Sequence, residues 1–82
     1  MVKNESQLFN ENAGMIDVLT GLIYEGLGLS LQEMRDFTNT IILLEKAHDI
    51  LQLCLGEYHP ATKKVKMEVD EASLVSQQSF IS

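Results

Sequence analysis

Apolar residues recur every three to four positions along most of the chain, and this spacing constrains the fold more than any other feature. The spacing matches the α-helical period and not the alternation of a β-strand. It predicts a first helix over residues 12–27 and an all-α fold. In this first segment the apolar residues are Met15, Ile16, Leu19, Leu22, Ile23 and Leu27.

Two further helices follow from the same period and from capping signals. Ser30 and Glu33 have the spacing of a capping box, which predicts a second helix over 31–55. A break near Asp36, with Asp36 as a second N-cap, is the alternative, because the β-branched and polar residues that follow it weaken a continuous helix. Gly56 occupies a typical C′ position, and Pro60 suits the first turn of a third helix over 60–76.

Three glycines, Gly14, Gly21 and Gly28, lie seven residues apart in the first helical segment. An interior glycine costs a helix ~1 kcal/mol relative to alanine, so these glycines argue either against the helix or for a neighbour that approaches the backbone closely. Gly26 and Gly28 mark the expected end of the helix. We therefore divide the chain into a flexible lead-in over 1–11, a helical domain over 12–76 and a polar tail over 77–82.

Three segments, Gly21–Tyr24, Leu43–Ile50 and Leu55–Pro60, together resemble a tetratricopeptide repeat (TPR). The sequence is similar to the longer repeats of kinesin light chains and to the C-terminal helical region of SET/MYND lysine methyltransferases. The resemblance covers residues 13–60 and implies an antiparallel helical hairpin, a single TPR-like repeat, followed by a C-terminal capping helix. The structural repeat positions that it implies are Gly21, Tyr24, Leu44, Ala47, Gly56, His59 and Pro60.

The same resemblance implies that the two helices of the hairpin meet along an internal seam. Two departures from the repeat pattern stand out: Leu29–Arg35 is an insertion of about seven residues, and Thr40 replaces the usual alanine. The insertion lengthens the second helix or rebuilds the turn. The residues expected in the seam are Leu19, Leu22, Tyr24, Leu44, Ala47 and Leu51.

Few residues have the pattern of a chemical site. Glu45 and His48 have the Glu-x-x-His spacing of a carboxylate-bridged metal centre, but such a centre needs a second pair, and the sequence contains no second copy. Cys54 falls at the C-terminal end of a helix, where the dipole opposes a thiolate, so we expect a buried thiol and not a nucleophile. His59 is expected to bond the loop backbone or to cap the next helix. We expect no catalytic residue, metal or cofactor.

Composition limits the function further. Among 82 residues, 12 are acidic and 6 are basic, which disfavours nucleic-acid binding because that activity needs clustered Lys and Arg. The longest apolar run, Ile41–Leu44, is too short to span a membrane. A lone cysteine and an N-terminus without a signal peptide favour a cytoplasmic location, with the nucleus as the other possibility.

The leading hypothesis is a non-catalytic protein–protein interaction module. Asp17, Thr20 and Glu25 on the first helix favour a basic or apolar peptide over an acidic one. One alternative is a C-terminal fragment of a SET/MYND-type methyltransferase that lacks the catalytic parts. Another is a helical protein that associates with itself as a homo-oligomer, because a single repeat leaves apolar surface for a neighbour to cover.

Overall fold

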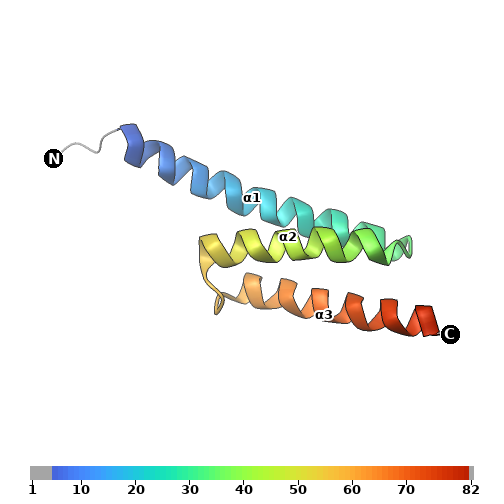
Figure 1. The fold of residues 1–82 in the computed structure, drawn as a ribbon. Coiled ribbons are helices and arrows are strands. Elements are labelled where there is room, and N and C mark those ends of the chain that lie inside the picture. The colour runs from blue at the N-terminus through green and yellow to red at the C-terminus, as the bar shows by residue number, and fades with distance from the viewer. Residues whose placement is uncertain (1–4, 82) are drawn as a thin grey trace.

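The computed structural model is an all-α chain of three helices, as the sequence predicts (Figure 1). It describes the backbone of residues 5–81 and the side chains of residues 15–78. The helices are α1 (Glu5–Glu33), α2 (Phe37–Leu55) and α3 (Pro60–Ile81). Successive helices run antiparallel, and α2 packs against both α1 and α3. The result is an elongated, flat molecule with principal extents of 63 × 22 × 13 Å.

The first helix is longer than expected at both ends. It continues through Gly26 and Gly28 to Glu33, so the predicted end near those glycines is wrong. The residues Leu29–Glu33 of the insertion extend α1 and not α2. The predicted helix over 31–55 and its capping box at Ser30 are therefore wrong, because Ser30 lies inside α1.

The turn between α1 and α2 contains a Schellman motif. Asp36 N donates to Leu31 O at 2.9 Å, Arg35 N donates to Gln32 O at 3.0 Å, and Arg35 has a φ of 65°. These two hydrogen bonds close the last turn of a helix, and the residue with left-handed backbone conformation is usually glycine. The insertion therefore supplies both the last turns of α1 and the turn itself.

Asp36 is the N-cap of α2, which confirms the alternative prediction. Its carboxylate accepts from Asn39 N at 3.4 Å and from Asn39 Nδ2 at 2.8 Å. Thr40 is fully buried one turn later, and its hydroxyl donates to Asp36 O at 2.8 Å. Thr40 is thus buried with its hydrogen bond satisfied.

The turn between α2 and α3 is the one that the sequence predicts. Gly56 ends α2 with a φ of 91°, and its N–H donates to Gln52 O at 3.0 Å. His59 caps α3: its Nδ1 accepts from Ala61 N at 3.0 Å, and its carbonyl accepts from Lys63 N at 3.0 Å. Pro60 is the first residue of α3, a position where its missing N–H costs nothing.

The outer boundaries of the predicted division can be compared with the helices only in part. Residues 1–4 of the expected lead-in and residue 82 of the expected tail lie outside the described residues. Helix α1 already begins at Glu5, and α3 continues from the expected end at residue 76 to Ile81. The helical region is thus longer in both directions than the predicted 12–76.

The hydrophobic core lies along α2, where this helix meets both α1 and α3. Its fully buried apolar residues are Leu44, Ala47, Leu51, Val65 and Ala72. Within residues 15–78, α1 contributes no large apolar side chain that is fully buried. Gly21 and Gly28 approach α2 closely, and Val18 and Tyr24 pack against the core as partly buried side chains. A core of this size gives a marginally stable domain.

Candidate functional site

Helix α1 packs on α2 through its smallest residues. A Cβ placed on Gly21 would lie 3.2 Å from side-chain atoms of Ile50 and Leu51, and one on Gly28 would lie 3.0 Å from Leu44 Cγ. The predicted close approach at Gly21 is thus observed, and Gly28 makes a second one. With these two glycines as the inner side of α1, the large apolar residues of the helix fall on the opposite side.

The outward face of α1 is a continuous apolar surface. Leu19 and Leu22, which were predicted to lie in the seam, are 58% and 42% exposed, so this prediction is wrong. Tyr24, Leu44, Ala47 and Leu51 do contribute to the packing between the helices. We define the outward face by its exposed apolar residues: Met15, Ile16, Leu19, Leu22, Ile23 and Leu27.

This outward face is large for a chain of this size. Its six side chains together expose roughly 600 Å², at the upper limit of the largest apolar patch on typical monomers. Gly26 lies among them, and a Cβ placed there would meet no atom within 4 Å. The two charged residues of α1 between Met15 and Ser30 are Asp17 and Glu25, and helical spacing places both on the side of Gly21. The face is therefore apolar without an interspersed charge.

A small group of charged side chains joins α1 to α3. Glu25 is 8% exposed, and its Oε2 lies 3.7 Å from Lys64 Nζ. Burial, followed by a hydrogen bond with Glu25 and the charge of Glu25, raises the pKa of Glu68 to about 7. Buried oxygens of both carboxyl groups, Glu25 Oε2 and Glu68 Oε1, lack a hydrogen-bond partner. This group places two carboxyl groups and one ammonium in a partly buried contact between helices.

The sequence offered no motif for the Glu25–Lys64–Glu68 group, and none of its members was predicted to act with the others. The available signal was the position of Glu25 between Gly21 and Gly28 at spacings of four and three, which places it on the glycine side of α1. Identifying Glu68 and Lys64 as its neighbours requires the packing of α3.

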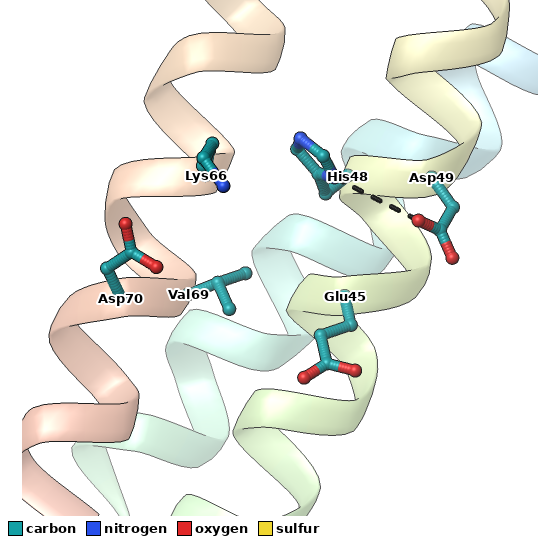
Figure 2. A pocket seen from close by; sticks show the side chains of 6 residues that line it. All are labelled: Glu45, His48, Asp49, Lys66, Val69 and Asp70. Atoms are coloured by element: carbon teal, nitrogen blue, oxygen red, sulfur yellow. Dashed lines mark ion pairs between the residues drawn. The ribbon is translucent and has the colours of Figure 1, made fainter. Parts of the chain in front are cut away.

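A shallow groove lies between α2 and α3 and contains the Glu-x-x-His pair (Figure 2). Its volume is about 190 Å³, which is below the range of ~300–1,000 Å³ for small-molecule sites. His48 Nδ1 lies 3.9 Å from Asp49 Oδ1. Across the groove, α3 contributes an ammonium as well as a carboxylate. The lining residues are Glu45, His48, Asp49, Lys66, Val69 and Asp70.

This groove has a poor donor set for a metal. The lysine adds positive charge to the lining, and the acidic residues are spread over both helices. Among the described side chains, no three His, Cys, Asp or Glu residues are placed to hold a metal ion. The groove is best described as a solvated charged surface.

The seven repeat positions fall at two places in the fold. Gly21, Tyr24, Leu44 and Ala47 lie where α1 meets α2, and Lys46 Nζ is 5.9 Å from the centre of the Tyr24 ring. The other three, Gly56, His59 and Pro60, form the turn into α3. None of the seven lines the groove between α2 and α3.

Cys54 does not have the buried environment that was predicted for it. The thiol is exposed on α2, because the buried positions of this helix are Thr40, Leu44, Ala47 and Leu51. Cys54 lies in the last turn of α2, beyond Leu51, the last buried position of this helix.

The fold and these surfaces define an all-α helical hairpin with a third helix, an architecture compatible with a helical repeat. None of the helices within residues 5–81 combines the length and the apolar character needed to cross a membrane. No known protein family, curated protein or solved structure matches the chain.

Proposed function

We propose that the chain is a non-catalytic protein–protein interaction module and that it binds its partner through the outward face of α1. The observation that supports this proposal most directly is the exposure of six large apolar residues on one helix face, between 42% and 68% for each residue. Exposed apolar patches of this size mark interaction surfaces. We further propose a TPR-like role for the helices, with α1 and α2 as one repeat and α3 as its capping helix.

The chemistry of the face selects an apolar partner. A helix that lays its own apolar side along α1 can bury the face without leaving an unpaired charge. The formal net charge of the chain is −6, which disfavours an acidic peptide at the margins of the contact. The open position at Gly26 allows the backbone of a partner helix to approach closely.

Site-specific photocrosslinking in cells tests the proposal. A photoreactive phenylalanine analogue replaces Ile23 on α1 in one variant and Met67 on α3 in a matched control, because these side chains are 62% and 69% exposed. We expect a crosslinked protein product from position 23 and none from position 67. A chain that gives no product from position 23, or equal products from both positions, would contradict the proposed binding face.

A further inference from the structure

We propose that the partner on the outward face of α1 is a second copy of this chain, so that two α1 helices pack face to face in a two-fold dimer. This inference rests on the proposed function and adds the identity of the partner. Three observations carry it: the area of the face, its lack of charge, and the length of α1 that α2 leaves uncovered.

The area is close to what a specific dimer requires. Two copies of the face would bury roughly 1,200 Å², the lower limit of the ~1,200–2,000 Å² found in stable protein–protein interfaces. The buried surface would be almost entirely apolar, as in homodimer interfaces. A two-fold arrangement brings the same patch to both sides, so one face has to be complementary only to itself.

The charge pattern fits self-association. The chain is acidic overall, but no charged side chain lies among the six apolar residues of the face. Asp17 and Glu25 lie on the side of α1 that contains Gly21, and Glu25 Oε2 lies 3.7 Å from Lys64 Nζ. Two copies can therefore meet at this surface without placing like charges opposite each other at the centre of the contact.

The register of α1 against α2 leaves part of α1 without a neighbour in the same chain. Gly21 packs against Leu51 and Gly28 packs against Leu44. Each residue toward the C-terminus of α1 therefore lies level with a residue one position nearer the N-terminus of α2. Continued along the helices, this register places Leu55, the last residue of α2, level with Asp17. Residues 5–16 therefore project beyond α2, as Figure 1 shows for the N-terminal part of α1.

A projecting helix of this length needs packing to be stable. In proteins most helical stability comes from tertiary packing of an apolar face. Met15 and Ile16, at the start of the outward face, lie in this projecting part and are 68% and 60% exposed. A second α1 that lies along the face covers both the body of the helix and its projecting part.

Sedimentation equilibrium of the purified full-length chain tests the proposal. We expect the wild type to dimerise with a dissociation constant in the micromolar range, as apolar interfaces near the lower size limit do. The variant Leu19→Glu/Ile23→Glu should weaken the dimer at least ~100-fold, because it places four carboxylates in the contact. The matched control Leu53→Glu/Met67→Glu, at 87% and 69% exposed sites on α2 and α3, should dimerise like the wild type.

Salt gives an independent signature of a self-contact. Two copies with a net charge of −6 repel each other, so added salt should tighten the dimer, whereas contact with a basic partner would weaken.

Circular dichroism checks that each variant stays helical. If Leu19→Glu/Ile23→Glu loses its helices, Gly26→Gln replaces it, because a side chain there meets no atom of its own chain.

The outcomes separate this inference from the proposed function. A wild-type chain that is monomeric at about 100 µM overturns the second copy as the partner, since a specific interface of this size would be populated there. In that case a crosslink from position 23 to a different protein would still support the proposed function. A dimer that persists unchanged in the charged variant, or in Gly26→Gln where that variant is used, also overturns the inference, because it would use another surface.

Discussion

Replacing Gly28 by alanine tests the packing of α1 on α2 most directly. Alanine improves the intrinsic helix propensity by about 1 kcal/mol. Its Cβ, however, would lie 3.0 and 3.1 Å from Leu44 Cγ and Cδ2 and 3.4 Å from the carbonyl oxygen of Thr40. Leu44 is fully buried, and the carbonyl oxygen belongs to the backbone of α2.

The expected result is a net loss of stability. Overpacking of a buried contact costs typically ~1–3 kcal/mol, which exceeds the gain in propensity over most of that range. We expect Gly28→Ala to lower the free energy of unfolding by up to about 2 kcal/mol and Tm by up to roughly 10 °C. Gly26→Ala is the matched control, because it lies in the same helix and meets no atom within 4 Å. It should raise the free energy of unfolding by about 1 kcal/mol.

Urea unfolding followed by circular dichroism measures both changes. The two alanines are introduced into the Leu19→Glu/Ile23→Glu background, so that association through the outward face does not enter the comparison. The difference between the two variants isolates the packing cost, since the change in propensity is the same at both sites. If Gly28→Ala stabilises the chain as much as Gly26→Ala does, the close contact between α1 and α2 is refuted.

Three further predictions concern the turn between α1 and α2 and the carboxyl pair. Asp36→Ala should lower the free energy of unfolding by about 1 kcal/mol in urea titrations, because it removes the N-cap of α2. Arg35→Gly should raise it by up to about 1 kcal/mol, because glycine adopts a φ of 65° without the strain of a side chain. The pKa of Glu68 is raised to about 7, so the stability that its neutral form provides is complete below its unfolded value near 4.5 and is lost as the pH rises toward 7. Glu68→Gln should therefore have the same free energy of unfolding as the wild type near pH 4.5. Above pH 7 its free energy of unfolding should be higher by on the order of 1 kcal/mol, a figure reduced for solvent screening. Thermal unfolding followed across this pH range measures the difference.

The sequence was sufficient to predict the fold class, the turn between α2 and α3 and the close approach of α2 to Gly21. Gly56, His59 and Pro60 act locally, through backbone conformation and short-range hydrogen bonds, so their roles follow from the residues themselves. The turn between α1 and α2 could not be predicted in the same way. Its left-handed residue is Arg35, whereas the familiar signal, glycine, occurs seven residues earlier at Gly28 and serves packing instead.

The orientation of α1 was the larger error, and it has a physical cause. A helical period reveals that a helix has an apolar side, but it does not reveal which side the neighbouring helix covers. In α1 the glycine side allows Leu44 and Leu51 of α2 to approach the backbone, and large residues at Gly21 and Gly28 would prevent this. The apolar stripe, with Leu19 and Leu22, then has to lie away from α2. The same period therefore gave the helix correctly and its buried side incorrectly.

The two sides of α1 together support the proposal that it is an inner helix of a larger assembly. Burial of a leucine or isoleucine contributes ~1.5–3 kcal/mol, yet the six apolar residues of the outward face contribute little of this within a single chain. The side that does contact α2 contains Gly21 and Gly28, which weaken α1 as an isolated helix. A helix with this composition gains further stability when its second side is also covered. The small core along α2 and the open face of α1 thus both support the proposed arrangement, in which a partner packs against α1.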